Sequence, residues 1–156
     1  MNFVDKLILV IGCLFVIASF FSVIIYYPEL PDEIPIHYGL DGIPDDYDEK
    51  SSIWSLPVLS LLMFIGLHYL SKINIPYNFA AKSVVKNTAY HRKTHYRFIQ
   101  ILNSIIAFIF FFLTYKTVQI GLGNETDLGN YFIYIVVVGL FTPIVVYIAL
   151  FYRKAF

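Results

Sequence analysis

One histidine stands in a strongly acidic stretch between the first two long apolar runs of the sequence. His37 lies between Asp32 and Asp45 in this stretch. An imidazole with nearby carboxylates is a ligand set that suits zinc or manganese, and it is also a pair from which a general base can be built. A third interpretation is structural, because such side chains bond to exposed backbone groups in a loop. Since the spacing matches no established metal motif, the sequence favours the structural interpretation. A divalent metal held by His37, Asp32 and Asp45 is the alternative.

Four common motifs of enzymes and metal or redox sites are absent from the sequence. It has no P-loop, no H-E-x-x-H zinc motif, no G-x-S-x-G serine motif and no C-x-x-C pair. We therefore predict no cofactor and expect a non-enzymatic protein.

The acidic stretch runs from residue 27 to residue 52. It contains eight acidic residues against one base, Lys50, and four of the seven prolines in the chain. Each proline fixes its own φ and restricts the residue before it. We therefore expect an ordered acidic, proline-rich extracytoplasmic loop whose apolar side chains pack onto the helices, these being Ile34, Ile36, Tyr38, Leu40, Ile43 and Tyr47.

The elements that must position this loop are membrane spans. Hydrophobic residues make up 58% of the chain and charged residues 14%, against about 45–50% and about 25% in soluble domains. A hydrocarbon core of about 30 Å takes about 20 helical residues, and only helices or closed barrels satisfy their backbone there. We predict an all-α integral membrane fold, a single four-helix bundle with spans at about 7–25, 53–70, 98–115 and 131–152. With a net charge of zero, the chain has no bulk basic field for nucleic acid.

Lysine and arginine predict the orientation of these spans. Two bases, Lys50 and Lys116, fall in the segments after the first and third spans. The other nine fall before the first span, between the second and third, and after the fourth: Lys6, Lys72, Lys82, Lys86, Arg92, Lys93, Arg97, Arg153 and Lys154. The positive-inside rule then places both termini in the cytoplasm.

The acidic loop also carries a family resemblance. Its string LPDEIPIHYGLDGIPDDYDEK resembles the signature of a family of small bacterial multi-pass membrane proteins of unknown function, whose domain also occurs at the N-terminus of the SdpI immunity protein. The resemblance implies location in the bacterial cytoplasmic (inner) membrane. The matching residues are Leu30, Pro31, Asp32, Ile34, Pro35, His37, Gly42, Pro44, Asp45 and Lys50.

Together these observations favour an interaction protein, immunity-like or sensor-like, in the lipid bilayer. We expect its outer loop to recognise a peptide or a membrane protein partner, and we predict Asp32, His37, Asp45 and Lys50 as the binding residues. One alternative is an accessory or structural subunit of a larger membrane complex. Another is a metal-dependent membrane enzyme that uses His37 and its neighbouring acids.

Overall fold

Four long helices and one β-hairpin form the described part of the chain. The computed structural model describes residues 2–73 and 88–152. In chain order the elements are α1 (Phe3–Tyr26), β1 (Glu33–Tyr38), β2 (Pro44–Glu49), α2 (Ser55–Leu70), α3 (Thr88–Gly121) and α4 (Phe132–Tyr152). Short 3₁₀ turns at Tyr27–Glu29 and Lys50–Trp54 join the hairpin to α1 and α2.

Within the described residues, four helices are long enough and apolar enough to cross a membrane, as the sequence predicts. The predicted spans at 7–25, 53–70 and 98–115 fall inside the first three of these helical segments, and the prediction at 131–152 overlaps the fourth. The helix α3 has 34 residues, which at 1.5 Å per residue is about 51 Å and exceeds a hydrocarbon core of about 30 Å. Its first turns therefore extend past the apolar segment. Four of the basic residues used to predict orientation, Lys82, Lys86, Arg153 and Lys154, lie outside the described residues.

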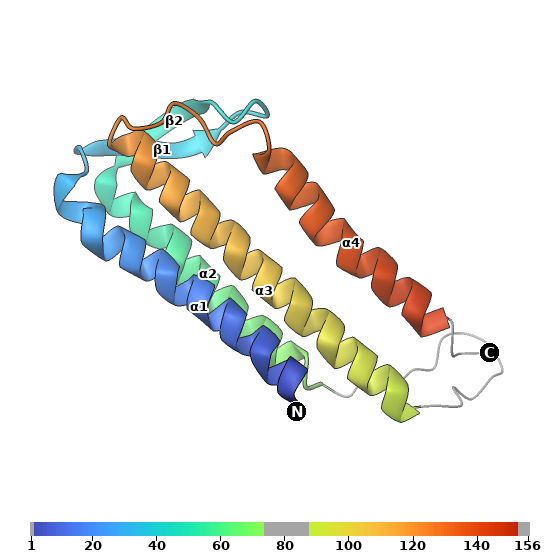
Figure 1. The fold of residues 1–156 in the computed structure, drawn as a ribbon. Helices are drawn as coiled ribbons and strands as arrows, with labels where there is room; N and C mark the ends of the chain where they lie inside the picture. The colour runs from blue at the N-terminus through green and yellow to red at the C-terminus, as the bar shows by residue number, and fades with distance from the viewer. Residues whose placement is uncertain (1, 74–87, 153–156) are drawn as a thin grey trace.

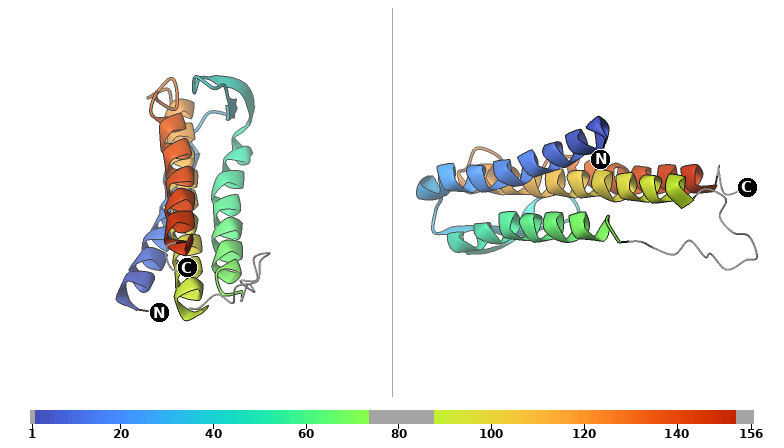
Figure 2. Two further views of the ribbon diagram at one scale, coloured as in Figure 1. Left: turned by 90° about the vertical axis from the view of Figure 1, so that its right-hand side faces the viewer. Right: turned by 90° about the horizontal axis from the view of Figure 1, so that it is seen from below.

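The helices are arranged around α3 rather than as four equal neighbours. α1, α2 and α4 each pack against α3, while α1 and α2 touch each other less. Figures 1 and 2 show α1 and α2 on different sides of α3, with α4 running along it as an added outer helix. The predicted four-helix bundle is thus three packed helices with α4 laid along α3.

The segment between α1 and α2 is a two-stranded antiparallel hairpin, which an all-α description does not include. Glu33 pairs with Glu49, and Tyr38 pairs with Pro44 near the turn. The hairpin lies across the same end of the molecule as the loop between α3 and α4, opposite the N-terminus (Figure 1). A dense proline content does not prevent this pairing, because a two-stranded sheet has only edge strands, where proline is tolerated.

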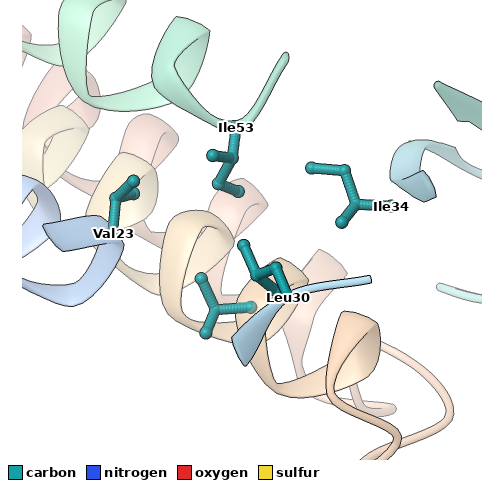
Figure 3. Packing of buried hydrophobic residues seen from close by; sticks show 5 residues of the cluster. Val23, Leu30, Ile34 and Ile53 are labelled. Carbon is teal, nitrogen blue, oxygen red and sulfur yellow. The ribbon is translucent and has the colours of Figure 1, made fainter. Parts of the chain in front are cut away.

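A small apolar core fixes the hairpin to the helices. Val23 of α1, Leu30, Ile34 of β1, Ile53 and Val118 of α3 form one buried cluster. Figure 3 shows the first four converging from separate segments of the chain. Segments that are distant in sequence therefore meet at this end of α3.

The predicted packing of six apolar loop residues is right for two of the three residues in β1 and wrong for the three beyond it. Ile34 is 1% exposed and Tyr38 is half-buried, but Ile36 is 46% exposed. The register of the strand shifts on both sides of His37, and Ile34 and Pro35 are buried in succession. Such bulges break the regular alternation of buried and exposed residues along a strand. The remaining three residues are also exposed: Leu40, Ile43 and Tyr47.

The core makes a prediction about the stability of the hairpin end. Ile34→Ala removes a fully buried side chain and should lower the unfolding free energy by roughly 2–5 kcal/mol. Ile36→Ala, two residues along the same strand, should change it by less than about 1 kcal/mol. Unfolding in detergent micelles, followed by circular dichroism, measures both. Equal losses for the two variants would contradict the packing described.

Candidate functional site on the hairpin

Lys50 joins the two ends of the hairpin. Its backbone N–H donates to the Asp32 carbonyl at 2.8 Å, and its ammonium lies 3.6 Å from a carboxylate oxygen of Asp32. The same ammonium is 3.5 Å from the Leu30 carbonyl oxygen and 5.7 Å from the centre of the Tyr27 ring. One cation thus holds the backbone before β1 to the backbone after β2.

A second pair lies between the strands, away from Lys50. His37 Nδ1 is 2.5 Å from Asp45 Oδ1. The two side chains are 69% and 52% exposed, so the pair faces solvent. Because Nδ1 is occupied by the carboxylate, Nε2 is the ring nitrogen that this arrangement leaves for a ligand.

The structure does not bring the three candidate metal ligands into one set. Asp45 pairs with His37, whereas Asp32 pairs with Lys50 at the base of the hairpin. Within residues 2–73 and 88–152, no three His, Cys, Asp or Glu side chains gather in a way that would hold a metal ion. The four predicted binding residues therefore form two separate pairs.

The turn of the hairpin is held by the loop between α3 and α4. Gly42 has a φ of +78°, a conformation that glycine adopts readily and other residues do not. Its carbonyl accepts a hydrogen bond from the Leu128 N–H at 3.0 Å. A Cβ at Gly42 would lie 3.3 Å from Cβ of the buried Leu128. Both the turn and its contact with the second loop therefore require glycine.

Tyr38 ties β1 directly to α3. Its hydroxyl oxygen lies 2.7 Å from Thr117 Oγ1. Burial raises the pKa of Tyr38 to about 12, against the opposing effect of the hydrogen bond to Thr117. A cavity of about 130 Å³ adjoins this contact under the strand, lined by residues that include Ile34, Ile53 and Leu113.

The strand β2 presents the acidic side chains. Asp45, Asp46, Asp48 and Glu49 are all exposed. The carboxylates of Asp46 and Asp48 accept hydrogen bonds from the backbone N–H of the next residue, at 2.9 Å and 2.8 Å. The strand thus presents negative charge to the solvent. Two of its backbone N–H groups are already hydrogen-bonded to its own carboxylates.

Several residues that position the site were not found by sequence reasoning. Thr117 and Leu128, which are distant from the hairpin in the sequence, form hydrogen bonds with it. A Cβ on Gly121, at the end of α3, would lie 3.1 Å from Leu30 Cδ2 and 3.4 Å from Ile34 Cγ2. The one sequence feature near these contacts was the glycine content of residues 121–130. It predicts a turn but does not predict a contact with the hairpin.

Most of the ten residues that matched the signature in the sequence have structural roles. Leu30, Ile34 and Pro35 are buried beneath the hairpin, Gly42 forms its turn, and Asp32 with Lys50 closes its base. The remaining members are the solvent-facing pair and two further prolines: His37, Asp45, Pro31 and Pro44. Most of the signature therefore encodes the hairpin and its attachment.

Comparison with known proteins gives one partial match. The described residues form four helices that are long and apolar enough to cross a membrane. Residues 14–61 match a domain of unknown function (DUF1648). That segment starts within α1, contains the whole hairpin and ends within α2. No curated protein and no solved structure matches the chain.

The contact between Tyr38 and Thr117 makes a second prediction. Tyr38→Phe should lower the unfolding free energy by about 1 kcal/mol, since it removes one hydrogen bond and leaves the Thr117 hydroxyl without this partner. Tyr47→Phe, on the exposed strand, is the control and should have almost no effect. Detergent unfolding at neutral pH measures the difference.

The same contact gives a dependence on pH. Tyr38 ionises near pH 10 in the unfolded chain and near pH 12 in the folded protein, so the wild type should lose stability relative to Tyr38→Phe between these values. A constant difference across that range would contradict the buried hydroxyl.

Proposed function

We propose that this chain is a non-enzymatic, multi-pass protein of the bacterial cytoplasmic membrane whose hairpin recognises a cationic peptide or a membrane partner. The observation that carries the proposal is the exposed acidic strand β2 on a hairpin that is anchored to α3. The resemblance to the domain at the N-terminus of the SdpI immunity protein supports a role in immunity or sensing. The predicted contacts are Asp32, His37, Asp45 and Lys50.

The distribution of charge supports an extracytoplasmic hairpin. Lys6, Lys72, Arg92, Lys93 and Arg97 lie on the ends of the helices opposite the hairpin, as the direction of each helix requires. Under the positive-inside rule, that end and both termini are cytoplasmic. The hairpin then faces the outside, where a peptide or an external segment of a partner can reach it.

The strand favours recognition by charge rather than by strand addition. An added strand would need the backbone donors of β2, and two of these already donate to the carboxylates of Asp46 and Asp48. Charged side chains on an edge strand also discourage pairing with another strand. A cationic segment is attracted by the four exposed carboxylates without displacing those bonds.

The proposal predicts that charge on β2 sets the affinity for a cationic probe. The full chain in nanodiscs is titrated with a fluorescently labelled oligolysine peptide at low salt. Asp46→Asn and Asp48→Asn keep an Oδ1 acceptor for the backbone and remove one charge each. Each should weaken binding by about threefold, the scale of one exposed ion pair.

Asp127→Asn is the matched control for these two variants. Asp127 lies in the other loop at the same end, and its carboxylate also accepts a local backbone hydrogen bond, from Gly129 at 2.7 Å. It should leave the affinity almost unchanged. Equal weakening by all three variants would indicate a diffuse field and would contradict a site on β2, as would a wild-type protein that does not bind the probe.

The two alternatives give different outcomes on purification in mild detergent. An accessory subunit would co-purify with a stoichiometric partner protein, and the function of the complex would then replace the proposal. A metal-dependent enzyme would contain stoichiometric metal that is lost in His37→Ala. We expect neither, because recognition by charge requires neither a permanent complex nor a metal ion.

A further inference from the structure

A long apolar groove lies between α3 and α4, away from the hairpin site. Its volume is about 590 Å³. Most of its lining is aliphatic or aromatic, and it includes Phe98, Ile101, Ile105, Val138, Val146 and Leu150. These residues lie on the segments of α3 and α4 that are apolar enough to cross a membrane. In a membrane, a groove on these segments opens to the hydrocarbon core rather than to water.

α3 and α4 contact each other at several positions along their length, and these contacts define the groove between them. Gly139 of α4 makes the close approach, since a Cβ there would lie 3.1 Å from Ile105 Cγ2. The rings of Phe98 and Tyr147 stack with centres 4.4 Å apart, and the Tyr90 hydroxyl donates to the Leu150 carbonyl at 3.3 Å. The helices touch at these points, and the groove lies along their seam.

One end of the groove is cationic. Arg97 is the one charged side chain among the described residues that line it. Its Nε donates to Asp5 of α1 at 2.8 Å, and its two terminal nitrogens make no hydrogen bond within residues 2–73 and 88–152. Lys72, Arg92 and Lys93 line a neighbouring pocket at the same end of the molecule, where Asp5 is the one acid among the described lining residues, so basic residues outnumber acidic ones there. A ligand in the groove thus meets apolar walls along its length and positive charge at one end.

We propose that this groove binds one anionic phospholipid, with an acyl chain along the seam of α3 and α4 and the phosphate beside Arg97. An amphiphile with a negative head and a long apolar tail complements both parts of the groove. Arg97 is suited to the head, because a guanidinium presents several donors in a planar fork that matches phosphate. This site is independent of the hairpin and of its proposed partner.

The test uses the full chain purified in detergent and native mass spectrometry. The protein is exchanged into micelles that contain either phosphatidylglycerol or phosphatidylcholine with the same acyl chains. The wild type should retain one phosphatidylglycerol and should prefer it to phosphatidylcholine by about fivefold, the effect of one basic residue at an anionic surface. Gly139→Leu should abolish retention, because the new side chain occupies the groove.

Gly66→Leu is the matched control, since a Cβ at Gly66 meets nothing within 4 Å. It should retain lipid as the wild type does. Because Gly139→Leu also lies at a helix contact, Thr142→Phe provides a second test: Thr142 lines the groove and is exposed, and its replacement should lower retention with the fold intact by circular dichroism. Unchanged retention in both groove variants, or equal retention of the two lipids by the wild type, would overturn the proposal.

Discussion

The close approach of the hairpin to the end of α3 is the constraint on which the external face of this molecule depends. Leu30 and Ile34 pack against α3 where Gly121 has no side chain. A Cβ there would lie 3.1 Å from Leu30, so neighbouring atoms would have to move. This contact sets the distance between strand β1 and the end of α3. Tyr38 then reaches Thr117, and the turn at Gly42 then reaches Leu128.

The helices below the hairpin are joined by polar contacts as well as by apolar packing. Ser19 Oγ lies 2.9 Å from Thr114 Oγ1, Ser104 donates to the Ile8 carbonyl, and Asn103 donates to the Phe64 carbonyl. In lipid, helix association gains little from the hydrophobic effect, and each such bond adds on the order of 0.6 kcal/mol. All three bonds involve α3: two join it to α1 and one joins it to α2.

The sequence was sufficient to predict the helices, because a run of about 20 apolar residues has few alternatives in a membrane. It was not sufficient for the contacts that set the site. Ile34, Ile36 and Tyr38 were all predicted to pack onto the helices, but Ile36 is exposed in a strand whose register shifts around His37. Lys50 and Asp32 were predicted as a functional set with His37 and Asp45, and the structure separates them into two pairs. Thr117 and Leu128 are distant in sequence, and no local pattern connects them with the hairpin.

The composition of β2 meets two requirements with the same residues. A two-stranded hairpin at a membrane surface has unprotected edges, and an edge strand invites pairing with another chain. Asp46 and Asp48 reduce this tendency, because their carboxylates accept hydrogen bonds from backbone N–H groups of β2 that a pairing strand would need. Their negative charge remains exposed, and under the proposed function it is the feature that attracts a cationic partner. The protection of the edge and the exposed negative charge therefore arise from one feature, and a neutral polar residue at these positions would retain the first and lose the second.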